Sequence, residues 1–239
     1  MERAQAPSVQ KLRIRFAKRD RLRFTSHRDF QRAFERALRR AHVPIAFSQG
    51  FSPHPKVSYA GAAPTGAASE AEYLEIAVTE ECDPSAVAKA LDDALPPGLD
   101  IVDVVTADEG SLADRLQASE WSIELPGAPV EELAAAVEAF LAESAIEVRR
   151  LTKNGVRTLD ARAAVVQMTV EHAGPALRLV VRHQTPTVRP DDVLTGLRTI
   201  GGLREARHVA TRLAQGPLDE ATGSVGDPLG RPGGRQSAR

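Results

Sequence analysis

The sequence predicts an α+β protein of two tandem ferredoxin-like (split βαβ) units with antiparallel sheets, followed by a disordered C-terminal tail. Short segments of alternating apolar residues, typical of half-buried strands, flank amphipathic helical segments. This order of strands and helices occurs twice along the chain. The C-terminal residues are rich in glycine and proline and lack apolar periodicity. We therefore expect units over residues 10–108 and 119–214, and a disordered tail over residues 215–239.

The first predicted strand covers residues 11–16, where apolar and basic side chains alternate. Leu12 and Ile14 fall on one face, and Arg13 and Arg15 fall on the other. This alternation predicts a half-buried strand, with its apolar face in the core.

Apolar periodicity and capping signals define the rest of the first unit. Asp83 followed by Pro84 is an N-cap with proline at the first helical position, and Pro-Pro-Gly at residues 96–98 ends that helix. The expected elements are a helix over residues 26–42, strands over 57–60 and 72–78, a helix over 84–95 and a strand over 99–105.

The second unit is expected to repeat this plan with an extra hairpin. Its turn falls at Lys153-Asn154-Gly155, because Asn-Gly is the strongest short signal for a hairpin turn. The expected strands are residues 121–125, 146–151, 157–161, 165–170, 177–181 and 205–213, and the expected helices are 130–140 and 190–200.

The charge of the 239-residue chain is strongly segregated although its formal net charge is only −1. Residues 1–56 hold 14 basic and 4 acidic side chains, residues 57–147 hold 2 and 20, and residues 148–239 hold 15 and 8. One interpretation is a basic face that binds a polyanion. The other is that the acidic middle folds against the basic segment and the two pair internally. The sequence leaves both open.

Several classes of protein are excluded by composition. Cys82 is the single cysteine, so the chain has no disulfide framework and no cysteine-based zinc or iron–sulfur site. His27, His42 and His54 are dispersed, and we expect neither a metal nor a cofactor. The chain has no 18-residue apolar run and no apolar core of a secretory signal near its first residue. A cytoplasmic protein is the expectation.

The helix over residues 26–42 carries the clearest candidate for a binding surface. Its apolar positions recur every three or four residues and form one stripe. Arginines occupy the other sides of the helix, either as a solvated face or as a ridge that contacts phosphates. The candidate phosphate contacts are Arg28, Arg32, Arg36 and Arg39.

The loop that follows this helix is the candidate for a more specific pocket. Two prolines bracket His54 and restrict its backbone, and Gly50 permits close approach of a ligand. Phe47 and Phe51 are of the type that stacks on bases in single-strand binders, although each phenylalanine alone is more often part of a core. The candidate pocket residues are Ser48, Gln49, Gly50, Phe51, His54 and Lys56.

Three runs of sequence carry a resemblance to a known family. They are S-H-R-D-F-Q-R-A-F-E-R-A-L-R-R-A, F-S-Q-G-F-S-P-H-P-K and S-E-A-E-Y-L-E-I. They resemble the radical-SAM-linked uncharacterised domain family, whose members occur as stand-alone bacterial proteins or fused to a radical SAM enzyme. The match covers roughly residues 10–215, and Arg28 departs from it where leucine is commoner. The resemblance implies an accessory role beside a radical SAM enzyme, with RNA modification as one such setting.

The chain itself lacks the three closely spaced cysteines that a radical SAM cluster needs. A radical SAM enzyme would therefore be a partner in trans, and this chain would present substrate or dock to it. The first hypothesis is a non-catalytic accessory protein that binds RNA or another anionic substrate. The second is a metal-independent endoribonuclease with His27 or His54 as general acid or base and Lys56 stabilising the phosphorane. The third is a protein-docking module that binds no nucleic acid.

Overall fold

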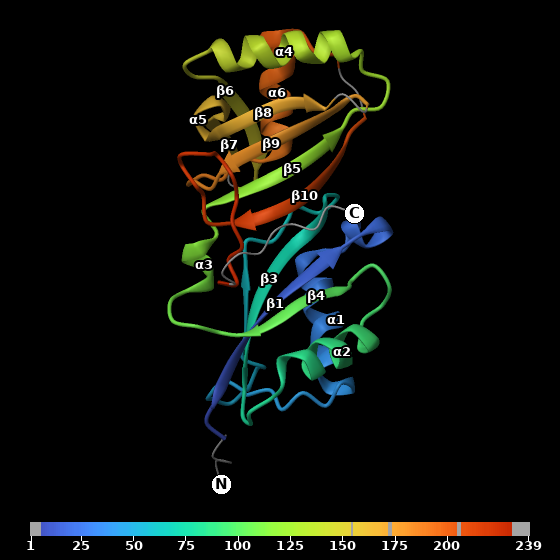
Figure 1. Ribbon diagram of the computed structural model, residues 1–239, viewed down its shortest axis with the longest axis vertical. Coiled ribbons are helices and arrows are strands. Elements are labelled where there is room, and N and C mark those ends of the chain that lie inside the picture. The colour runs from blue at the N-terminus through green and yellow to red at the C-terminus, as the bar shows by residue number, and fades with distance from the viewer. Residues whose placement is uncertain (1–5, 154, 172–173, 205–206, 231–239) are drawn as a thin grey trace. The chain divides into compact units, whose positions relative to one another are not determined.

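The computed structural model describes residues 6–153, 155–171, 174–204 and 207–230. It is an α+β protein with antiparallel strand pairs, which confirms the predicted class (Figure 1). Contacts divide the chain into two compact units. Unit 1 comprises Met1–Arg115 with Asp227–Arg239, and unit 2 comprises Leu116–Gly226. Within the described ranges, no helix is long and apolar enough to cross a membrane.

Unit 1 contains a four-stranded antiparallel sheet with two long helices on one face (Figure 1). Its strand order is β4–β1–β3–β2. The core lies between the helices and the sheet, and Leu12, Phe34, Leu74 and Leu91 are almost completely buried there. The elements are β1 (Gln10–Lys18), η1 (Asp20–Phe24), α1 (His27–Arg40), β2 (Val57–Ala60), β3 (Ala68–Val78), α2 (Pro84–Ala94), β4 (Ile101–Thr106) and α3 (Leu112–Arg115).

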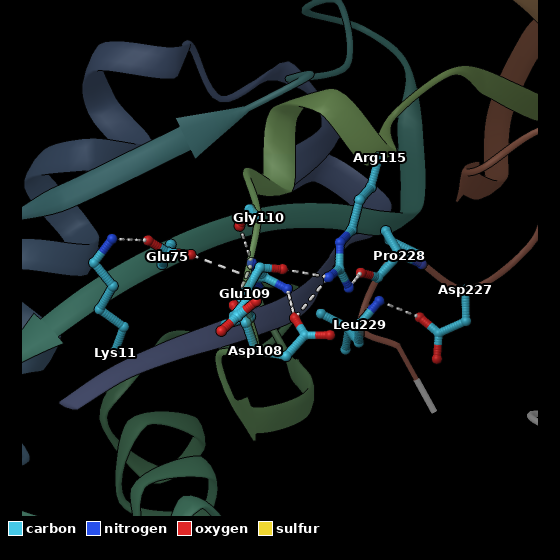
Figure 2. A network of polar contacts seen from close by, with 10 residues as sticks. Lys11, Glu75, Asp108, Glu109, Gly110, Arg115, Asp227, Pro228 and Leu229 are labelled. Carbon is cyan, nitrogen blue, oxygen red and sulfur yellow. Dashed lines mark hydrogen bonds and ion pairs between the residues drawn. The ribbon is translucent and has the colours of Figure 1, made fainter. Parts of the chain in front are cut away.

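One face of β1 agrees with the predicted alternation and the other differs from it. Leu12 and Ile14 lie in the core, as expected. Arg13, expected on the opposite side of a half-buried strand, is also completely buried. Polar and backbone groups of residues 108–110 bond to its guanidinium from the face of the sheet away from the helices (Figure 2). The alternation of β1 could not reveal a contact with a segment about 95 residues further along the chain.

The guanidinium of Arg13 is bonded on several sides, as a buried charge requires. Its Nε donates to Glu75 at 3.2 Å, and its Nη2 donates to the carbonyl oxygens of Asp108 at 3.2 Å and Gly110 at 2.6 Å. Its Nη1 also pairs with the Asp108 carboxylate. Arg115 contacts the same carboxylate at 2.8 Å (Figure 2). Arg115, followed by Arg13, holds the pKa of Asp108 below its usual value.

We expect Arg13→Ala to lower the free energy of unfolding of unit 1 by about 2–3 kcal/mol, because it leaves a cavity and deprives Glu75 and Asp108 of a shared partner. Arg13→Met fills most of the space without the charge and should cost less. Urea unfolding followed by far-UV circular dichroism measures both losses. Wild-type stability in Arg13→Ala would show that the network does not stabilise the unit.

Unit 2 also contains a four-stranded antiparallel sheet, in the order β10–β5–β9–β8, with a separate two-stranded hairpin of β6 and β7. The predicted hairpin is therefore present, although Asn154 of its turn lies outside the described residues. The elements are β5 (Ala118–Glu124), α4 (Val130–Ala142), β6 (Glu147–Thr152), β7 (Gly155–Asp160), α5 (Ala161–Ala164), β8 (Val165–Glu171), β9 (Ala176–Arg182), α6 (Pro190–Gly201) and β10 (Val209–Gly216).

The predicted strands of unit 2 differ from the structure at their ends, and two of them serve as examples. The strand expected over residues 157–161 ends at Asp160, because the Asp160 carboxylate accepts the backbone N–H of Arg162 and caps the short helix α5. The last strand, expected over residues 205–213, runs from Val209 to Gly216. Residues 205–206 of that prediction lie outside the described ranges.

The segment predicted to be disordered from residue 215 is folded up to residue 230. Strand β10 continues to Gly216, and Leu218 forms an antiparallel bridge with Val225. The Asp219 carboxylate accepts the backbone N–H groups of the two residues at 221 and 222. Such local turns leave no apolar periodicity in a sequence, and this is why the prediction missed them. Residues 231–239 lie outside the described residues.

Helices α4 and α6 of unit 2 pack closely through glycine. A Cβ added at Gly201 would lie 2.5 Å from the Cα and Cβ of Ala136. We expect Gly201→Ala to destabilise unit 2 by about 1–3 kcal/mol, because the two backbones must move apart. Gly174→Ala is the matched control, since its added Cβ meets nothing within 4 Å. Equal melting temperatures of the two variants would contradict this expectation.

Candidate functional site

Helix α1 forms where the sequence predicted it, for reasons local to the segment. The Ser26 Oγ accepts the backbone N–H of Asp29 at 3.2 Å and caps the first turn, where the Asp29 carboxylate also suits the helix dipole. Phe30, Phe34 and Leu38 form the buried stripe that fixes the helix on the sheet. The opposite side of α1 therefore faces solvent.

The four predicted phosphate-binding residues all lie on this solvent side. Arg28, Arg32, Arg36 and Arg39 are exposed, and none of their side chains makes a hydrogen bond or ion pair with another residue that the structure describes. Arg40 differs, because its guanidinium donates to the carbonyl oxygen of Ala94 in α2 at 2.5 Å. We call the four exposed arginines the arginine ridge.

Acidic residues of the middle segment pair with cations at β1 rather than with the arginine ridge. Arg19 contacts Glu70 and also Asp100, the latter at 2.7 Å. Glu75 contacts Lys11 at 3.0 Å and the buried guanidinium described above. Of the two interpretations of the segregated charge, internal pairing therefore accounts for the cations at β1, whereas the side chains of the ridge are not paired with any residue that the structure describes.

The loop after α1 is a narrow hairpin with a well-defined base (light blue in Figure 1). Phe47 and Pro55 form an antiparallel bridge. Beyond it, the backbone N–H of Ser48 donates to the carbonyl oxygen of His54 at 2.8 Å, and the N–H of His54 donates to the Ser48 Oγ at 3.0 Å. Gly50, with φ of +116°, supplies a backbone conformation that other residues rarely adopt. We call residues 48–54 the aromatic loop.

Most of the predicted pocket residues are exposed, and all of them except Lys56 lie on this loop. Gln49, Gly50, Phe51, His54 and Lys56 are exposed. Ser48 is half-buried, and its side chain helps to close the loop. The loop that the sequence predicted is present, and most of its candidate residues are exposed to solvent.

The aromatic loop follows the C-terminal end of the arginine ridge along the chain. The chain leaves α1 after Arg40, and the backbone N–H of Thr79, just beyond β3, donates to the carbonyl oxygen of Pro44 at 2.8 Å. Ile45 then bridges to Val78, the last residue of β3. The C-terminal end of the ridge, at Arg39, therefore leads directly to the base of the aromatic loop.

His27 lies at the opposite end of α1 and lines a small pocket. The ring of Tyr59 meets the His27 ring edge-to-face at a centroid distance of 5.0 Å. The pocket, with its open mouth, has an empty volume of ≈ 390 Å³, and Lys18, Tyr59 and Glu72 also line it. Because these residues come from three strands far apart in sequence, no motif spacing indicated them. His27 and His54 are not brought together by the fold.

The comparisons with known proteins give a family. Residues 11–190 match the family described as "Uncharacterized protein conserved in bacteria (DUF2344)". The chain belongs to the DUF2344 family. A search of curated proteins found no match. Among solved structures, a chain titled "Crystal Structure of an Unknown Protein from Galdieria sulphuraria" matches at 15% identity, over 85% of this chain and 98% of that one. Its TM-score of 0.27 is too low for the two folds to be equated.

The region matched to DUF2344 contains the arginine ridge, the aromatic loop and the His27 pocket. Within the described part of this DUF2344 chain, no three His, Cys, Asp or Glu residues are grouped so that they could hold a metal ion.

The His27 pocket makes a pH-dependent contribution to the stability of this DUF2344 protein. Burial, with a smaller effect of the Glu35 carboxylate, raises the pKa of Tyr59 well above its ordinary value. The unfolded chain thus releases this proton near pH 10, whereas the folded chain retains it. We expect the free energy of unfolding to fall as pH rises above about 10, and Tyr59→Phe to reduce that fall. Urea unfolding of the wild type and of Tyr59→Phe at about pH 8 and about pH 11 tests this. An identical fall in the free energy of unfolding in the two proteins would contradict it.

Proposed function

We propose that this DUF2344 protein is a non-catalytic accessory protein that binds RNA through the arginine ridge and the aromatic loop. The observation that carries the proposal is the set of four exposed arginines on one side of α1 that have no partner among the described residues. Unpaired guanidinium groups in such a row attract a polymer of regularly spaced phosphates.

The spacing of the ridge supports an extended polyanion as the ligand. Its residues are separated by four, four and three positions, so they stay on one side of the helix. From Arg28 to Arg39 the helix rises about 16 Å, which is long enough for several phosphates of one strand. Arginine also presents a planar set of donors that matches phosphate oxygens.

We further propose a radical SAM enzyme as the partner in trans. The support is the sequence resemblance, together with the single cysteine of this chain, which cannot hold a cluster alone. The accessory protein would hold the RNA while the enzyme carries out the chemistry.

We interpret each unit as a ferredoxin-like split βαβ unit, and the tandem arrangement is part of the proposal. The equivalent strand orders β4–β1–β3–β2 and β10–β5–β9–β8 support it. In unit 2, the β6–β7 hairpin and α5 would be an insertion between α4 and β8.

The nuclease hypothesis has less support than RNA binding. His27 is near the start of α1, whereas His54 closes the loop beyond the far end of α1. A nuclease would consequently have to use His54 and Lys56 without His27. The protein-docking hypothesis would leave the arginine ridge without a phosphate ligand.

Filter binding of purified protein to total RNA at about 50 and about 200 mM salt tests the proposal. With four contacts to single-stranded RNA, the affinity should fall ~50-fold over this range. Arg32→Gln with Arg36→Gln should weaken binding at low salt and reduce the slope of log affinity against log salt by about 1.4.

The matched control is Arg149→Gln with Arg157→Gln, which removes the same charge from exposed positions of the β6–β7 hairpin. It should bind like the wild type. If the ridge double variant and the hairpin double variant weaken RNA binding equally, the loss is a nonspecific effect of charge. Absence of RNA binding by the wild-type protein would overturn the proposal. RNA recovered from the filter is examined for cleavage, and cleavage that disappears in His54→Ala with Lys56→Ala would establish the nuclease instead.

A further inference from the structure

Phe51 is an apolar side chain whose position folding does not explain. Its relative exposure is 111%, more than that of any other large hydrophobic side chain that the structure describes as exposed. A phenyl ring in this position buries no surface and adds no hydrophobic stabilisation to unit 1. Its presence at the tip of the aromatic loop therefore indicates contact with another molecule.

Hydrogen bonds hold the backbone at the base of the loop that carries this ring. The two hydrogen bonds between Ser48 and His54 close the loop, and the N–H of Lys56 donates to the carbonyl oxygen of Ala46 at 2.7 Å below them. Pro53 and Pro55 further limit the backbone. Because the backbone is ordered before a ligand arrives, little conformational entropy is lost on binding.

The surroundings of Phe51 favour a base over an apolar protein pocket. The hot spot of a protein interface is normally enclosed by further contacts that exclude water. Here the exposed neighbours along the chain include four polar or cationic residues, Gln49, Ser52, His54 and Lys56, beside the apolar Phe47 and Pro53. An aromatic ring beside cationic groups is the combination by which proteins bind single-stranded nucleic acids without strict sequence preference.

We propose that Phe51 stacks on an unpaired base, so that this protein binds single-stranded RNA in preference to duplex RNA. This inference rests on the proposed RNA-binding function and specifies the class of RNA. The ridge holds the phosphates of a strand, and the strand continues past Arg39 to the aromatic loop, where a base meets the ring. In a duplex the bases are already paired and stacked, and only the ridge contacts remain available.

Fluorescence anisotropy with a labelled single strand of about 12 nucleotides and the corresponding duplex tests the inference at low salt. Wild-type protein should bind the single strand more tightly. Phe51→Ala should lose roughly tenfold in affinity for the single strand and change little toward the duplex. Phe51→Trp should restore the affinity, and the fluorescence of the added tryptophan should be quenched when a base stacks on it.

Phe24→Ala is the matched control, since Phe24 is also exposed (59%) but precedes the N-terminal end of α1. It should keep the single-strand preference. If Phe51→Ala retains wild-type affinity while binding still weakens with salt, the stacking inference is overturned and the arginine ridge stands. An equal loss in Phe24→Ala would also overturn it. If wild-type protein binds neither RNA, the proposed function itself fails.

Discussion

The buried guanidinium of Arg13 is the interaction on which the arrangement of unit 1 depends. Arginine keeps its charge at any accessible pH, so a completely buried one must find carboxylates and carbonyl oxygens. It finds them on β3, at Glu75, and in the connection at Asp108 and Gly110. That requirement fixes the connection after β4 against the face of the sheet opposite α1 and α2. Arg115 donates to the carbonyl oxygens of Glu109 in this connection and of Pro228.

This pairing also decides where the free positive charge of unit 1 lies. Carboxylates of the acidic middle segment form ion pairs with cations beside β1. Glu70 and Asp100, which both pair with Arg19, are a second example. Helix α1 packs against the other face of the sheet, and its outer side has only Asp29 and Glu35 as acidic residues of its own. The segregation of charge along the sequence thus becomes a segregation in space, with one neutralised surface and one cationic helix.

The sequence was most informative where the decisive contacts are local. Helix α1 was predictable because its apolar stripe, N-cap and exposed arginines all follow from positions three or four residues apart. Arg13 was not, since its burial results from residues about 95 positions away. The residues lining the His27 pocket, such as Lys18 and Glu72, likewise come together only when β1 and β3 pair. The turns after Gly216 depend on side-chain caps, which periodicity does not detect.

The arginine ridge and the aromatic loop offer different kinds of interaction to a ligand. A row of arginines attracts any polyanion, because phosphate contacts carry charge but little information about base pairing. Discrimination has to come from a group that distinguishes a free base from a paired one, and an exposed aromatic ring that stacks on the base does so. The Pro44 carbonyl oxygen accepts the N–H of Thr79, and the N–H of Ala46 donates to the carbonyl oxygen of Ala77, so the segment between the ridge and the loop is held against the end of β3. In the proposed complex, the phosphate contacts and the aromatic contact would follow one another along the bound strand in the order of the residues along the chain.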